Sequence, residues 1–170
     1  MKKLLILAVC SFFLTAASFA QKYAIIDTKY ILDKMPDYGT AQKALDDMAT
    51  NWQKEIDNMQ LELDKMYKDF EAEQVMLSDD LKKKREDQLF VKEKGLRDLQ
   101  RKRFGFEGDL FKKRQELIKP IQDKVYNAVQ KLAVTRGYDF ILDKSEGITV
   151  IFADPKLEKS DDVLKELGVK

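Results

Sequence analysis

Residues 41–70 read AQKALDDMATNWQKEIDNMQLELDKMYKDF, and this stretch decides the fold. Its apolar residues recur in steps of three or four, at positions 41, 45, 48, 52, 56, 59, 63, 66 and 70. This spacing places them on one face of an α-helix and is close to the heptad of a coiled coil. The stripe is too long for an ordinary globular helix, so we expect a long helix that packs along a second one.

A second charged stretch continues the pattern and favours a helical hairpin. Ser78 is a good N-cap for the second helix, and Gly137 stands where a C′ residue ends it. Apolar residues of this second stripe lie at positions 81, 89, 96, 99, 106, 110, 117, 121, 125, 128 and 132. The two arms cover about residues 37–77 and 79–119, roughly 60 Å each at 1.5 Å per residue. Pro120 marks a kink or a restart of the helix.

The two arms carry opposite charge. From Asp37 to Asp80 there are 12 acidic and 4 basic residues, whereas from Leu81 to Lys119 there are 14 basic and 7 acidic residues. An exposed ion pair is worth only about 0–1 kcal/mol. The charges summed over each arm nevertheless favour antiparallel pairing of the two arms over pairing of like arms.

Residues 1–20 have the features of a cleaved signal peptide: two lysines, a short apolar run and small residues up to Ala20. A lipoprotein signal ending at Cys10 is the competing interpretation. Cleavage after Ala20 removes the only cysteine, and the chain has no histidine. Disulfides, thiol or histidine catalysis and ordinary zinc sites are therefore excluded. Because the net charge is near zero, nucleic acid is not an expected partner. We expect no enzyme activity, cofactor or metal.

Short β-branched runs flank the hairpin. Residues 23–26 are consistent with a strand, and residues 138–142 and 148–152 with a β-hairpin around turn residues 144–147. The expected fold is mainly α with a small β body, which is marginal alone and favours oligomerisation. The parts are a signal peptide (1–20), a β body (21–36 and 137–170) and a helical hairpin (37–136), in which residues 120–136 return to the body.

Five motifs carry a family resemblance: Tyr23-Ala24-Ile25-Ile26-Asp27, Tyr30-Ile31-Leu32, Met35-Pro36-Asp37-Tyr38, Gly137-Tyr138-Asp139-Phe140-Ile141-Leu142-Asp143 and Asp161-Asp162-Val163-Leu164-Lys165. Their order around a long charged hairpin resembles the Skp/OmpH family of periplasmic chaperones. The resemblance implies a jellyfish-shaped homotrimer, in which a β-barrel-like core carries three hairpins as tentacles. It also implies ATP-independent holding of unfolded outer-membrane β-barrel proteins in the periplasm. The implied trimer core comprises Ile25, Ile26, Phe140, Leu142, Val150 and Phe152.

Apolar residues beyond the needs of a two-helix seam are the candidates for client binding. On the second arm these are Phe90, Phe104, Phe106 and Phe111. On the first arm they are Met59, Met66, Tyr67, Phe70 and Met76. Packing within the seam is the alternative for each of them. Three basic clusters, at residues 82–85, 101–103 and 112–114, are expected to form a solvated face or to make weak contact with lipid headgroups. A structural or adaptor coiled coil of the envelope, and a peripheral membrane binder, remain the rival functions.

Residues 101–110, RKRFGFEGDL, pose a separate question, because two glycines stand beside three basic residues. A phosphate-binding loop would need a preceding strand, which is missing. The stripe continues through Phe106, so we expect an unbroken helix that tolerates both glycines. The hairpin geometry sets Gly105 and Gly108 beside Trp52. These three residues are therefore the predicted hinge, where the glycines make room for the indole or soften the arm.

Overall fold

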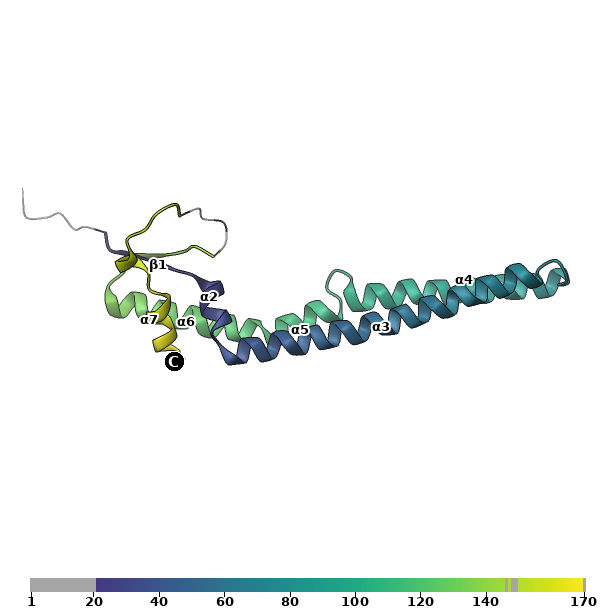
Figure 1. Cartoon of the computed structure of the whole chain (residues 1–170), viewed down its shortest axis with the longest axis horizontal. Coiled ribbons are helices and arrows are strands. Elements are labelled where there is room, and N and C mark those ends of the chain that lie inside the picture. The colour runs from purple at the N-terminus through teal and green to yellow at the C-terminus, as the bar shows by residue number, and fades with distance from the viewer. Residues whose placement is uncertain (1–20, 146, 148–149, 170) are drawn as a thin grey trace, which may run out of the picture. The chain divides into compact units, whose positions relative to one another are not determined.

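A computed structural model describes residues 21–145, 147 and 150–169 (Figure 1). The predicted signal peptide and the competing Cys10 signal lie outside the described residues. The chain divides into two compact units. One, the hairpin unit, comprises residues 32–124. The other, the sheet unit, combines the chain before residue 32 with the chain from residue 125 onward.

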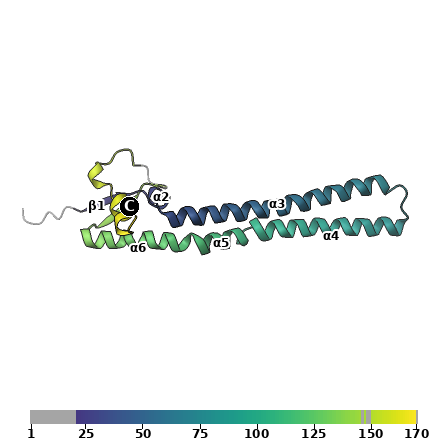
Figure 2. The same cartoon turned by 60° about the horizontal axis from the view of Figure 1, so that its bottom comes forward.

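The hairpin unit is formed by α3 (Pro36–Glu73), α4 (Asp79–Phe104) and α5 (Asp109–Leu117), with the start of α6 (Lys119–Arg136). Both views show α3 running side by side with α4 and α5 (Figures 1 and 2). The predicted stripe is the buried or half-buried face except at Leu81 and Phe106, which are exposed. The helices α3 and α4 meet in one cluster, which we call the seam cluster: Ile56, Leu63, Leu89 and Leu96. The heptad spacing therefore predicts the contact face correctly.

Four ion pairs join the two arms, and in each the acid lies on α3 and the base on the returning arm. The pairs are Glu73–Arg85 (3.2 Å), Glu62–Lys92 (2.6 Å), Glu55–Arg103 (3.1 Å) and Asp37–Lys124 (3.4 Å). The hydrogen bond from the Lys92 ammonium also holds the pKa of Glu62 below its ordinary value. These pairs confirm the predicted match between an acidic and a basic arm.

The prediction of an unbroken second helix is wrong. The helix α4 ends at Phe104 and α5 begins at Asp109, so residues 105–108 form a loop, called here the 105–108 loop. Its backbone leaves the helix at Gly105 (φ −68°, ψ 173°), and Glu107 is left-handed with φ 55°. A Cβ on Gly108 would lie 2.8 Å from the carbonyl oxygen of Gly105. The glycines thus permit a tight loop that side chains would obstruct. The expected restart at Pro120 is confirmed, because α6 begins one residue earlier.

The sheet unit is organised around a two-stranded parallel sheet of β1 (Tyr23–Ile26) and β2 (Phe140–Asp143). On the other side of β1, a single bridge joins Ile25 to Glu158. Three short helices complete the unit: α2 (Thr28–Asp33), the 3₁₀ helix η1 (Pro155–Leu157) and α7 (Ser160–Glu166). Its buried residues include Ala24, Ile25, Ile26, Ile31, Leu132, Val163 and Leu164.

Gly137 ends α6 as predicted. It has φ +66°, and its N–H donates to the carbonyl of Val134. The N–H of Tyr138 reaches back to the carbonyl of Ala133 at 2.9 Å. These two bonds are the pattern of a Schellman motif, which requires a left-handed residue and therefore favours glycine.

The expected β-hairpin of residues 138–142 and 148–152 is also wrong. The strand β2 pairs with β1, and residues 150–152 belong to no strand, whereas residues 148 and 149 lie outside the described part of the chain. Phe152 is 86% exposed and Ile151 is 95% exposed, so these two side chains are not covered within the chain. The proposed core residues accordingly differ in burial: Ile25 and Ile26 are buried within one chain, Leu142 and Val150 are half-buried, and Phe140 and Phe152 are exposed.

Candidate functional site

The four phenylalanines predicted to exceed the seam are all exposed. Phe106 is 97% exposed and Phe90 is 60% exposed, and Phe104 and Phe111 are also on the surface. They come from α4, the 105–108 loop and α5, so they follow the second arm. Exposure of aromatic rings on a surface otherwise rich in charge is unusual, because such side chains gain free energy when they leave water.

The predicted residues of the first arm fall into two groups. Met59, Met66 and Phe70 are partly buried and pack against the seam cluster. Tyr67 and Met76 are exposed. The first group therefore serves the seam, while the second is available on the surface.

Three exposed apolar residues of the hairpin escaped the sequence analysis, Leu61, Val75 and Val91, and a fourth, Leu81, is exposed although it was assigned to the stripe. Leu61 and Val91 lie off the heptad stripe. An apolar residue off the buried stripe is expected on the surface, so the sequence pattern could have identified both. Val91 borders an open groove of about 390 Å³, with walls formed by Met66, Lys84, Asp87, Gln88, Val91 and Lys92. The hairpin thus presents apolar surface on both arms.

Trp52 lies against the base of the 105–108 loop, as the hairpin geometry predicts. Its ring meets that of Phe104 edge-on, with centroids 6.4 Å apart and planes at 78°. The Arg103 guanidinium lies 4.9 Å from the centroid of the Trp52 ring. The indole therefore has an aromatic and a cationic neighbour.

Arg103 joins three elements at this point. One terminal nitrogen of its guanidinium is 2.8 Å from Asp109, the first residue of α5, and the other is 3.1 Å from Glu55 on α3. Burial of the guanidinium disfavours its charge, but the hydrogen bonds to Asp109 and Glu55 outweigh this and raise the pKa of Arg103. Sequence reasoning missed this role, since Arg103 looked like one member of a solvated basic cluster.

A family model described as outer membrane protein (OmpH-like) matches residues 22–167. The chain belongs to this OmpH-like family. One relative is the chaperone protein Skp of Yersinia enterocolitica, which is 27% identical over 177 residues that cover 98% of this chain and 99% of the relative. A crystal structure of a protein from Caulobacter crescentus, described as an OmpH-like outer membrane chaperone, has the same fold with a TM-score of 0.69. Its identity is 14%, and the match covers 90% of this chain and 87% of the other.

Family membership bears on one sequence prediction. The Skp/OmpH family is non-enzymatic, which confirms the prediction that this OmpH-like chain is not an enzyme. Among the described residues, no group of three or more acidic, histidine or cysteine side chains is placed to hold a metal ion. In the same part of the chain, no helix is both long enough and apolar enough to cross a membrane.

Proposed function

We propose that this OmpH-like protein is an ATP-independent holdase chaperone of the periplasm. It binds unfolded outer-membrane β-barrel proteins with apolar side chains of its helical hairpins and prevents their aggregation. The observation that carries the proposal is the set of exposed phenylalanines along the second arm of a hairpin whose surface is otherwise rich in charge. Family membership and the Skp relative support the same role.

The chemistry of the hairpin suits such a client. An unfolded barrel protein exposes apolar strands of no fixed sequence, so its binder needs apolar contacts on a surface that demands no single shape. Exposed methionine, such as Met76, adapts to irregular partners. Charged residues beside the apolar ones keep the complex soluble, and weak contacts at each point let the client leave.

A homotrimer would cover apolar side chains of the sheet unit that are exposed in the single chain. The two-stranded sheet is short, and a sheet this small is marginal by itself. Phe140, Ile151 and Phe152 are exposed in the single chain. Three copies would cover these residues in a joint β core, from which three hairpins project as tentacles. Static light scattering of the purified protein would give the mass of three chains, and a concentration-independent monomer would contradict the trimer.

The decisive test of the holdase role is an aggregation assay. An outer-membrane β-barrel protein is diluted from urea, and its turbidity is followed with and without this protein, in the absence of ATP. We expect near-complete suppression at about one trimer per client. Unchanged turbidity would refute the holdase function. Capture of one folded partner, with no affinity for unfolded chains, would instead establish an adaptor coiled coil.

A further inference from the structure

We propose that the 105–108 loop is a preformed binding site for clients, which we call the client anchor. In this arrangement Phe106 inserts into an apolar stretch of an unfolded polypeptide, and Arg103 is the positioning residue that holds the loop in its binding form. The inference rests on the proposed holdase function and assigns part of its binding to a single loop.

The loop has a conformational cost that packing within the chain does not explain. Residues 99, 106 and 110 would continue the apolar stripe in an unbroken helix, which would direct Phe106 toward α3. Instead the helix stops, Glu107 adopts a left-handed conformation, and Phe106 becomes the most exposed phenylalanine of the hairpin at 97%. A strained backbone that exposes a large aromatic ring is typical of a binding function.

The loop is nevertheless held in one form. The N–H of Gly105 donates to the carbonyl of Arg101 at 2.8 Å, and the N–H of Gly108 donates to the carbonyl of Gly105 at 2.9 Å. Arg103 then ties the end of α4 to Asp109 at the start of α5 and to Glu55 on α3. The planar guanidinium presents one terminal nitrogen to each carboxylate while it lies over the indole, an arrangement that the single nitrogen of lysine does not reproduce.

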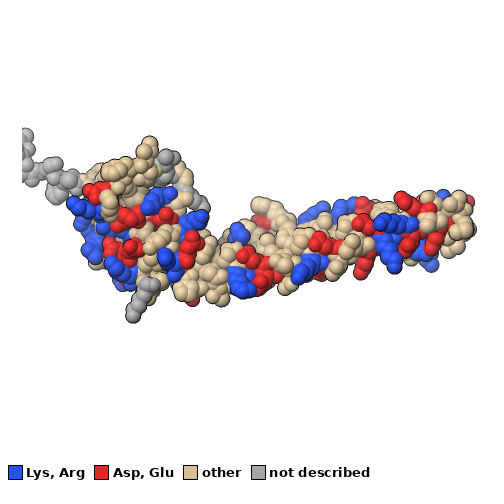
Figure 3. Space-filling model, viewed as in Figure 1, with Lys and Arg blue, Asp and Glu red and all other residues tan. Residues whose placement is uncertain are grey.

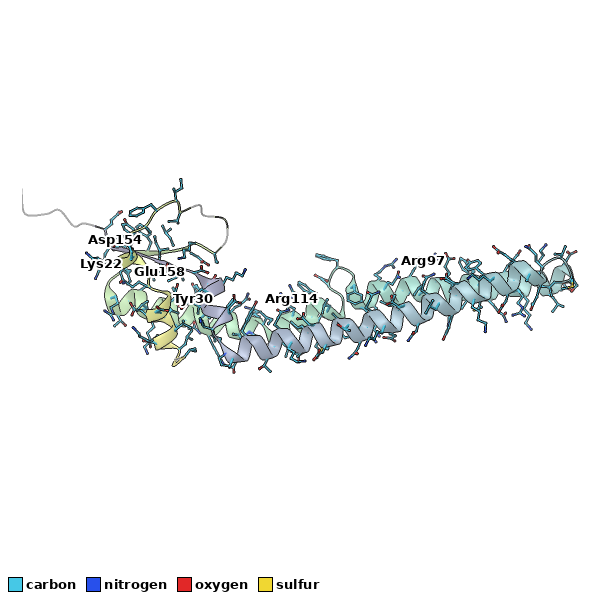
Figure 4. All side chains as sticks on the ribbon, in the orientation of Figure 1. Lys22, Tyr30, Arg97, Arg114, Asp154 and Glu158 are labelled. Carbon is cyan, nitrogen blue, oxygen red and sulfur yellow. The ribbon has the colours of Figure 1, made fainter. Side chains whose placement is uncertain are left out.

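The surroundings of the loop favour an apolar stretch of unfolded chain as its occupant. In Figure 1 the loop bulges away from α3, and in Figure 3 it is a mostly uncharged knob on a charged surface. Exposed Phe104 and Phe111 flank it on the adjoining helices. Arg97 on α4 and Arg114 on α5 lie on either side of the loop along the arm (Figure 4). A protruding ring with aromatic neighbours packs against an irregular apolar segment of the client, and this contact needs no preformed pocket in the client.

The experiment measures equilibrium binding of a fluorescently labelled outer-membrane β-barrel protein, diluted from urea, to the wild-type protein, four single variants and one double variant. We expect Phe106→Ala to weaken binding about threefold to tenfold, the range of a moderate anchor residue. Val134→Ala is the control, because Val134 is 85% exposed but lies on α6 outside the hairpin unit. It should change the affinity less than about twofold.

The positioning role of Arg103 is tested by a double-mutant cycle. Arg103→Gln should weaken client binding about threefold when Phe106 is present and have no effect in the Phe106→Ala background. Arg103→Lys, which keeps the charge but offers one nitrogen in place of two, should fall between wild type and Arg103→Gln. An Arg103→Gln effect of equal size in both backgrounds would overturn the positioning role, because a general loss of stability does not depend on Phe106.

The outcomes separate the anchor from the holdase function. If wild type binds the client and Phe106→Ala binds it equally well, the anchor is refuted and the holdase function stands. If wild type does not bind the client, the holdase function fails, and the anchor fails with it. If Phe106→Ala lowers the mass of the assembly in light scattering, the ring is seated on a second copy, which also overturns the anchor.

Discussion

Substitution of alanine for glycine at three positions of the second arm should change stability in opposite directions. Gly95 is in the interior of α4, and a Cβ there would lie 3.9 Å from Met59 Cε, an ordinary contact. Gly95→Ala should therefore stabilise the fold by about 0.5–1 kcal/mol, the usual helix-interior difference. At Gly105 a Cβ would collide with the carbonyl oxygen of Arg101, and at Gly108 with that of Gly105. Because backbone must move in both cases, each substitution should destabilise by about 1–3 kcal/mol.

The assay is urea unfolding of the three single variants, followed by circular dichroism at the helix band. A slope of about 1–3 kcal/mol per molar urea converts 1 kcal/mol into a midpoint shift of roughly 0.3–1 M. The midpoint should rise for Gly95→Ala and fall for Gly105→Ala and Gly108→Ala. A rise for all three variants would show that residues 101–110 form an unbroken helix, and it would refute the 105–108 loop.

Three further predictions follow from burial, backbone and charge. Leu63→Ala in the seam cluster should cost about 2–4 kcal/mol in urea unfolding, whereas Leu61→Ala, at a position 66% exposed, should cost less than about 0.5 kcal/mol. Glu107→Gly should raise stability by about 0.4–1 kcal/mol, since glycine adopts φ 55° without strain; a lower midpoint would contradict the left-handed conformation. Burial disfavours the charge of Asp143, but hydrogen bonds led by that from Thr28 outweigh it and lower its pKa. The stability that this carboxylate adds at neutral pH is lost as the pH falls below about 4, so Asp143→Asn should flatten the fall of the urea midpoint in that range; an identical pH dependence would contradict it.

The hairpin was predictable because its determinants recur along the sequence. A stripe of three- and four-residue steps gave the buried face, including Leu45, Ile56 and Leu63. The opposite charges of the two arms gave the ion pairs between α3 and the returning arm. Trp52 and Phe104 meet where the antiparallel geometry sets them.

The 105–108 loop was not predictable from the local pattern. Phe106 occupies a stripe position, and the pattern contains nothing that marks it as expelled from the helix. The contact that fixes the loop joins Arg103 to Glu55, 48 residues earlier in the chain. The two glycines three residues apart were the available signal, and they become decisive only when the tight backbone contacts are known.

The pairing of the strands was missed for a related reason. Local reasoning joins residues 138–142 to the next apolar run, since neighbouring strands often form hairpins. The structure instead joins β2 to β1, where the backbone N–H of Lys22 also donates to the side chain of Asp139, 117 residues away. A parallel pair between the two ends of the chain leaves no mark on the sequence of either strand.

The most direct test of the central claim is the mass of the complex with an unfolded client. An outer-membrane β-barrel protein is diluted from urea into the purified protein, and the mixture is separated by size-exclusion chromatography with static light scattering. The account predicts one soluble peak with the mass of three chains plus one client, without ATP. Client lost to precipitation, with this protein eluting at its own unchanged mass, would contradict it.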